Sequence, residues 1–253
     1  FGLSPLDEAQ QAAMKAYNDN HTRALIITPT GPWGAAIANA LQQTWQALGG
    51  RTIAQLTYTK RDDINKDMQR LLNVAQSNAR ALNLHYVLRE KIRTIPRRRK
   101  DFDAIFLIAG PAQAHEIMPL LKFYYAGNIP VYATSLVYAG LPRPRIDHDL
   151  NGVVFDDMPW VLKSNAQLPG AVAQIQNRVK TLWPGSYAQN TRLYALGVDA
   201  YNIIPKLGKL VILPKFGVYG ATGMLYLYPN QHIYRKLLWA QMVHGKPRLL
   251  PGA

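Results

Sequence analysis

The fold class follows from the stretch Phe123-Tyr-Tyr-Ala-Gly-Asn-Ile-Pro-Val-Tyr-Ala-Thr-Ser135. We expect Tyr125-Ala-Gly127 to end a helix, with the glycine in the left-handed cap position. Pro130 prevents the helix from continuing, because proline lacks the backbone N–H that a helix needs. Residues 131–133 then form a short apolar strand that ends in two hydroxyl side chains, Thr134 and Ser135. A helix, a turn and a buried strand in this order are typical of α/β proteins.

Other apolar runs have the composition of strands that are covered on both faces, since they are continuous and rich in β-branched residues. The expected strands are 24–28, 52–58, 103–109, 130–134 and 151–156. The helices expected between them cover 5–18, 33–48, 62–81 and a segment ending at Gly127. This alternation predicts a doubly wound parallel five-stranded sheet with right-handed crossovers and strand order 2-1-3-4-5.

The pattern changes after Trp160. A polar linker leads to two expected helices, 169–182 and 190–206, separated by Trp183-Pro-Gly185. Short strands follow at 224–228 and 233–240. The helix over 190–206 is apolar nearly all round, as expected for a helix buried between layers.

Composition narrows the function classes. The chain has 253 residues, of which 48% are hydrophobic and 17% charged, so it can form a good-sized core or two lobes. It contains no cysteine, which excludes disulfides, thiolate metal sites and a cysteine nucleophile. No apolar run approaches the ~18 residues that a membrane-spanning helix needs.

The formal net charge of +14 is concentrated between Lys60 and Lys100, where twelve Lys and Arg face four Asp and Glu. Nucleic-acid binding is not expected, because no aromatic-interleaved recognition signature or helix-turn-helix accompanies the charge. Arg97, Arg98 and Arg99 are predicted to form a partner-binding surface, since arginine pairs bidentately with carboxylates and phosphates. The alternative is a solvated loop in which one arginine pairs with Asp101 or Asp103.

Catalytic motifs are weak. No serine stands in a Gly-x-Ser-x-Gly setting, and Gly31-Pro-Trp-Gly34 lacks the lysine of a phosphate-binding loop, so these glycines are expected to serve a strand–helix turn. Asp147-His148-Asp149 is interpreted as a solvated loop and Asp156-Asp157 as a hinge or hydrogen-bonding pair. Trp160 is expected in the core. We predict no metal, no cofactor and no enzymatic activity.

Polar residues at the carboxyl ends of parallel strands are the candidate ligand contacts, because open α/β sheets bind ligands there. These candidates are Thr28, Thr30, Gly110, Gln113, Thr134, Ser135 and Tyr138. We expect Thr30, Ser135 and Tyr138 to line a polar depression.

The amino-acid sequences of several stretches resemble those of one protein family. They are residues 123–135, 149–160, Phe1-Gly-Leu-Ser-Pro-Leu-Asp-Glu8, Pro96-Arg-Arg-Arg99 and Arg192-Leu-Tyr-Ala-Leu-Gly-Val-Asp-Ala200. The chain resembles the C-terminal domain of outer-membrane lipoproteins that activate class A penicillin-binding proteins. The resemblance implies a type I periplasmic-binding-protein fold, with residues 1–164 as a complete lobe and 165–253 returning to contribute helices and short strands to a second, incomplete lobe. It also implies that first-lobe structure preceding Phe1 is absent, which would leave the helix 190–206 exposed.

Two functions follow from this resemblance and the fold. The first is a non-enzymatic regulator at the periplasmic face of the outer membrane, held there by an upstream lipid anchor. It would bind a class A penicillin-binding protein and promote peptidoglycan transpeptidation, with peptidoglycan as a further candidate partner. The second is a periplasmic solute-binding module for a small polar ligand, such as an amino acid or a peptidoglycan fragment. We find no Arg/Asp pair at the predicted strand ends that could bind the charged groups of an amino acid. This absence favours the regulator function over solute binding.

Overall fold

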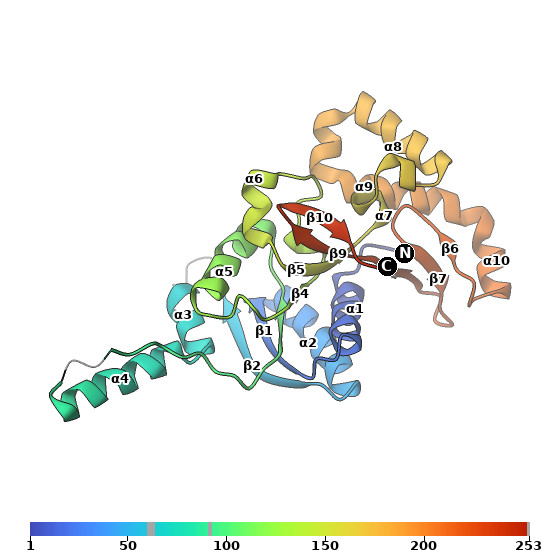
Figure 1. Cartoon of the computed structure of the whole chain (residues 1–253). Helices are drawn as coiled ribbons and strands as arrows, with labels where there is room; N and C mark the ends of the chain where they lie inside the picture. Colours follow the sequence, from blue (N-terminus) through green and yellow to red (C-terminus); the bar gives the residue numbers. More distant parts are fainter. Residues whose placement is uncertain (60–63, 91–92, 252–253) are drawn as a thin grey trace.

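A seven-stranded sheet forms the centre of the computed structural model, which describes residues 1–59, 64–90 and 93–251 (Figure 1). Five strands are parallel: β1 (Arg23–Pro29), β2 (Arg51–Tyr58), β3 (Ala104–Leu107), β4 (Val131–Ala133) and β5 (Val153–Asp157). They lie in the order β5-β4-β3-β1-β2, and each neighbouring pair is parallel. The predicted parallel sheet and its strand order are therefore confirmed.

Helices cover both faces of this sheet. The helices α1 (Pro5–Asn18) and α2 (Pro32–Ala47) pack on one face, and α3 (Ile64–Leu71) and α5 (Pro111–Phe123) on the other. Successive residues of β1 point to opposite faces, so that Ile26 joins the core under α1 and α2 while Ile27 joins the core under α3 and α5. Burial on both faces explains why these strands read as continuous apolar runs.

The first helix begins where the sequence indicates. The Ser4 hydroxyl accepts a hydrogen bond from the Asp7 N–H at 3.3 Å, Pro5 is the first helical residue, and acidic residues occupy the first turn. These features satisfy a free N–H and suit the positive end of the helix dipole. The acidic residue Glu8 is nevertheless buried, which becomes important at the polar cluster described below.

The C-terminal strands differ from the prediction. The expected strand over 233–240 is two strands, β8 (Ile233–Lys236) and β9 (Leu238–Val243), which belong to different sheets. Strand β9 pairs antiparallel with β5, and β10 (Lys246–Leu249) pairs antiparallel with β9. Assigning all of 165–253 to a second lobe was therefore wrong for 238–249. Strand β9 pairs with β5 because β5 would otherwise be an edge strand, with backbone N–H and C=O groups that lack hydrogen-bond partners.

The remaining elements form a second group beside the sheet (Figure 1). It contains a three-stranded antiparallel sheet, β6 (Val218–Tyr219), β7 (Met224–Leu227) and β8, together with α7 (Pro159–Leu162), α8 (Gly170–Leu182), α9 (Pro184–Ile203) and α10 (Leu207–Ile212). The break expected at 183–185 is confirmed, because Trp183 is non-helical and separates α8 from α9. Helix α9 starts earlier than the expected residue 190, and its non-helical residue Asn190 marks a kink inside it. The domain boundary at 164/165 remains a prediction.

The predicted exposure of the second long helix is confirmed. Leu193, Tyr201 and Ile204 are exposed, and an open groove of about 390 Å³ runs along α9 beside Ile175 of α8.

The basic region is more helical than the sequence indicated. Asn73 adopts a left-handed conformation with φ of 58°, which separates α3 from α4 (Val74–Leu88). Helix α4 extends to Leu88, seven residues beyond the end of the helix expected over 62–81, and it projects away from the sheet (Figure 1). The first two residues of the helix expected over 62–81 lie outside the described residues.

Two turns show where backbone geometry requires particular residues. After α5 the left-handed residue is Tyr125, with φ of 63°, and not Gly127 as predicted. Between β1 and α2, Gly31 has φ of 100°, and a Cβ on Gly34 would lie 2.1 Å from the Pro29 carbonyl oxygen. The glycines of Gly31-Pro-Trp-Gly34 thus serve the strand–helix turn, as expected. A short helix, α6 (Pro144–Asp147), follows β4.

We expect Gly34→Ala to lower the free energy of unfolding by about 1–3 kcal/mol, because the new methyl group overlaps a backbone atom that cannot move aside cheaply. Gly197→Ala in α9 is the matched control. Nothing lies within 4 Å of its Cβ position, and alanine should raise helix stability by about 0.5–1 kcal/mol. Urea unfolding followed by tryptophan fluorescence measures both, and equal effects would contradict the packing argument.

Candidate functional site

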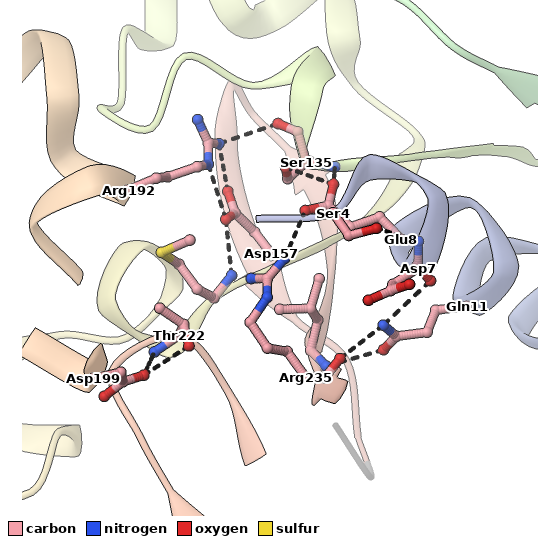
Figure 2. A network of polar contacts seen from close by, with 12 residues as sticks. Ser4, Asp7, Glu8, Gln11, Ser135, Asp157, Arg192, Asp199, Thr222 and Arg235 are labelled. Atoms are coloured by element: carbon pink, nitrogen blue, oxygen red, sulfur yellow. Dashed lines mark hydrogen bonds and ion pairs between the residues drawn. The ribbon is translucent and has the colours of Figure 1, made fainter. Parts of the chain in front are cut away.

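A buried polar cluster lies at the carboxyl ends of β4 and β5, where the sequence predicted a ligand site (Figure 2). Its members come from five elements that are distant in the sequence: Glu8 of α1, Ser135 after β4, Asp156 and Asp157 of β5, Arg192 of α9 and Arg235 of β8. The cluster thus joins the parallel sheet to the second group of elements.

Asp157 and Arg192 form its central ion pair. The guanidinium donates to both carboxylate oxygens, from Nε at 3.1 Å and from Nη2 at 2.6 Å. Nη2 also donates to the carbonyl oxygens of Ser135 and Tyr138. Burial opposes the positive charge of Arg192, but Asp157 and the other nearby negative groups together raise its pKa above the ordinary arginine value. The hydrogen-bonding role predicted for the aspartate pair is confirmed for Asp157.

A second set of contacts involves Glu8. The Ser135 hydroxyl donates to Glu8 Oε2 at 2.8 Å and the Ser135 N–H to the same oxygen at 3.2 Å, while Arg235 Nη2 lies 3.5 Å from Oε1. Burial raises the pKa of Glu8, while Arg235 and the Ser135 hydrogen bond lower it, and the net direction is upward. The side chain of Gln11 donates to the Arg235 carbonyl and accepts from the Leu237 N–H, which ties α1 to the C-terminal strands.

Asp156 is the least satisfied member. Its side chain is fully buried, and within the described residues neither carboxyl oxygen has a hydrogen-bond partner; the same holds for Nε and Nη1 of Arg235. Burial and the negative charges of Glu8 and Asp157 raise the pKa of Asp156 well above its ordinary value. A proton on Asp156 leaves two carboxylates facing two guanidiniums, so the buried charges balance.

Helix α9 carries a second buried anchor, Asp199. One carboxylate oxygen accepts from the Ala221 N–H at 2.7 Å. The other accepts from the N–H and hydroxyl of Thr222 at 2.7 and 2.6 Å (Figure 2). Asp199 lies two turns after Arg192, so one helix binds the sheet through Arg192 and the turn before β7 through Asp199. The sequence analysis did not predict the roles of Arg192 and Asp199. Two charged residues seven positions apart in a largely apolar helix could have indicated them, because such charges need partners when the helix is buried.

The predicted ligand contacts have different surroundings. Thr28, Thr134, Ser135 and Tyr138 are buried, Gly110 and Gln113 are half-buried, and Thr30 is exposed. Thr28 donates to the Gly34 carbonyl at the start of α2. In this conformation Ser135 and Tyr138 do not line an open depression together with Thr30. Ligand binding by these seven residues stays a prediction.

The three consecutive arginines divide into two roles. Arg98 donates to the carbonyl of Tyr125 and lies over the Phe102 ring, and Arg99 makes a bidentate pair with Asp101. The alternative of an arginine pairing with Asp101 is thus confirmed for Arg99. Arg97 has an exposed side chain, while its N–H donates to Ser77 of α4. A partner-binding role for the three remains a prediction.

The other candidate motifs are structural. Asp147 is buried beside His115 and accepts from the Arg143 N–H, so the interpretation of 147–149 as a solvated loop was wrong for Asp147. Trp160 is buried, as expected. Across residues 1–59, 64–90 and 93–251, no three His, Asp or Glu side chains are grouped as a metal site, and no helix there is long and apolar enough to span a membrane.

The mostly parallel sheet with helices on both faces defines a protein of the type I periplasmic-binding-protein class. A putative branched-chain amino acid ABC transporter from Rhodospirillum rubrum shares this fold, with 17% identity and a TM-score of 0.69 over 98% of this chain and 66% of that one. The chain belongs to the family described as "LppC putative lipoprotein", whose profile matches residues 1–245.

Named relatives agree with this assignment. The "Penicillin-binding protein activator LpoA" of Photobacterium profundum is 29% identical over 95% of this chain and 38% of its own length, and that of Edwardsiella piscicida is 31% identical over 97% and 36%. The solved "LpoA (YraM) C-domain from Haemophilus influenzae, a regulator of PBP1A" has a TM-score of 0.68 and 25% identity, covering 99% of this chain and 68% of that domain. The chain spans less than two-fifths of the length of these curated relatives.

Arg192→Ala should lower the free energy of unfolding by about 3 kcal/mol, because it leaves the Asp157 carboxylate buried without its partner. Arg192→Lys should recover only part of this, since lysine cannot form the bidentate pair. Arg178→Ala, an exposed arginine on α8, is the control and should change stability by less than about 0.5 kcal/mol. Chemical denaturation of the variants measures the differences, and a neutral Arg192→Ala would contradict the proposed anchor.

The raised pKa of Asp156 predicts a pH dependence. Between the pKa of the unfolded state, about 3.9, and the higher folded-state pKa, the folded protein binds the extra proton, so this group's stabilising contribution decreases as pH rises. Asp156→Asn removes the titrating proton. Its free energy of unfolding relative to wild type should therefore increase from pH 4 toward pH 8. The exposed control Asp149→Asn should show no such trend, and a constant difference for Asp156→Asn would refute the assignment.

Proposed function

We propose that this chain is part of a non-enzymatic activator of a class A penicillin-binding protein, which promotes transpeptidation during peptidoglycan synthesis. The observation that carries the proposal is its similarity along 95–97% of its length to proteins named as penicillin-binding protein activators. The site geometry supports it, because Ser135 and Asp157 at the strand ends are held in contacts with Glu8 and Arg192.

The proposed location is the periplasmic face of the outer membrane. The family description as a lipoprotein supports attachment through a lipid anchor elsewhere in the protein. Fractionation of cells expressing the full protein tests this location. Recovery with the inner membrane or the cytoplasm would contradict it.

The activity is tested by adding the purified full protein to a purified class A synthase with lipid-linked disaccharide-peptide substrate. We expect a several-fold rise in the fraction of cross-linked peptides. A type I binding protein of unrelated function is the control, and an unchanged cross-linked fraction would contradict the proposal. Hydrolysis of peptidoglycan by the protein alone would contradict its non-enzymatic character.

Capture of a small polar solute is the second candidate. The shared fold favours it, but Ser135 and Tyr138 are buried at the strand ends in the closed cluster. Calorimetric titration with amino acids and peptidoglycan fragments separates the two functions. A saturable heat of binding in wild type that is lost in the Ser135→Ala variant would favour solute capture.

A further inference from the structure

Helix α4 projects from the lobe as an arm (Figure 1). It is attached at its N-terminal end, where Val74 is buried and Ser77 accepts a hydrogen bond from the Arg97 N–H at 3.0 Å. Every residue from 82 to 90 is exposed. We use "arm" below for residues 74–90 and 93–97.

The arm exposes apolar side chains that a protein surface usually covers. Leu82, Tyr86 and Val87 are 70%, 83% and 73% exposed, and Leu84 and Leu88 are exposed as well. Because successive helical residues are turned by about 100°, these five lie on every side of the helix instead of along one face. Large apolar side chains exposed together usually mark a surface that another molecule covers. The expected occupant therefore surrounds the helix.

The charge of the arm indicates the chemistry of that occupant. Residues 74–100 contain eight Lys and Arg and one acidic residue, Glu90. Arg98 and Arg99 are engaged inside the molecule, but Arg80, Arg89, Arg93 and Arg97 are exposed. A basic arm is attracted to an acidic surface and repelled by a second copy of this chain, whose net charge is +14.

A hollow of about 490 Å³ beside the end of α4 is lined by His85, Tyr86, Val87 and Arg89, so apolar and cationic groups are presented together. Binding flat on a lipid surface requires apolar and charged side chains on opposite faces. Their mixture around α4 favours a protein groove over a membrane.

We propose that the arm docks into an acidic groove with apolar walls on a partner protein. Arg80, Arg89 and Arg93 would pair with carboxylates at the rim, and Leu82, Tyr86 and Val87 would fill the groove. This inference rests on the proposed function, which identifies the partner to be tested as the periplasmic part of a class A penicillin-binding protein.

Two double variants of the full protein test the arm. Tyr86→Ala with Val87→Ala removes apolar contacts, and Arg80→Glu with Arg93→Glu reverses charge. Controls of equal chemistry lie elsewhere: Ile212→Ala with Phe216→Ala, which are 78% and 73% exposed, and Lys209→Glu with Lys215→Glu, also exposed. All of these side chains are exposed, so the midpoints of thermal unfolding should stay within a few degrees of wild type.

Binding to the immobilised synthase is measured by biolayer interferometry at low and moderate salt. Each arm variant should weaken binding by about tenfold or more, since a few central residues supply most of the binding free energy of an interface. The controls should stay within about twofold. The charge variant should also reduce the salt dependence of the dissociation constant.

The outcomes separate the two proposals. If wild type binds and the arm variants bind equally well, the arm proposal is overturned and the activator function stands. If wild type does not bind or stimulate the synthase, the proposed function fails and the arm loses its partner. A third outcome concerns vesicles of phosphatidylglycerol and phosphatidylethanolamine. If wild type binds these vesicles, only the arm variants lose that binding, and the affinity for the synthase is unchanged, the arm binds a lipid surface. This result would overturn the proposal of a protein groove.

Discussion

The ion pair between Asp157 and Arg192 holds the two parts of the molecule together, because it joins the end of β5 to α9 through a fully buried carboxylate. A buried charge is tolerated only when it is paired and hydrogen-bonded. This constraint explains the surrounding contacts: the carbonyls of Ser135 and Tyr138 accept from Arg192, and Glu8 is brought against Ser135 and Arg235. Asp199 continues the arrangement two turns along α9, so the helix is bound through charged side chains at its middle and near its C-terminal end.

This cluster occupies the edge at which open α/β sheets commonly hold ligands. The fold is shared with binding proteins, but Ser135 and Asp157 at this edge are bound by Glu8 and Arg192 of the same chain. Function resides in the site and not in the fold, and here the accessible chemistry lies at the surface. The arm carries exposed apolar and cationic groups, and α9 exposes a separate apolar face. The proposed regulator would act by contact and would need such surfaces on a rigid support, which the doubly covered sheet provides.

The sequence located part of the cluster. Ser135 was predictable because it directly follows an apolar strand, and Asp157 because it ends the next one. Arg192, Asp199 and Arg235 were missed, since each comes from a segment whose partner lies at least 22 residues away along the chain. The arginines of 97–99 show the same limit: their composition indicated a surface patch, but only contacts with Tyr125 and Asp101 revealed that two of them support the loop.

The sequence by itself determined the parallel sheet, its strand order and the helix starting at Pro5, because these depend on local signals: continuous apolar runs, a serine cap and the spacing of strands and helices. Only the tertiary structure decided that β9 and β10 complete the sheet beside β5, that Asp147 is buried and that α4 extends into solvent. Strand pairing across more than eighty residues, and the burial of a charge, depend on which groups the folded chain brings together. The local periodicity of the sequence does not predict these long-range contacts.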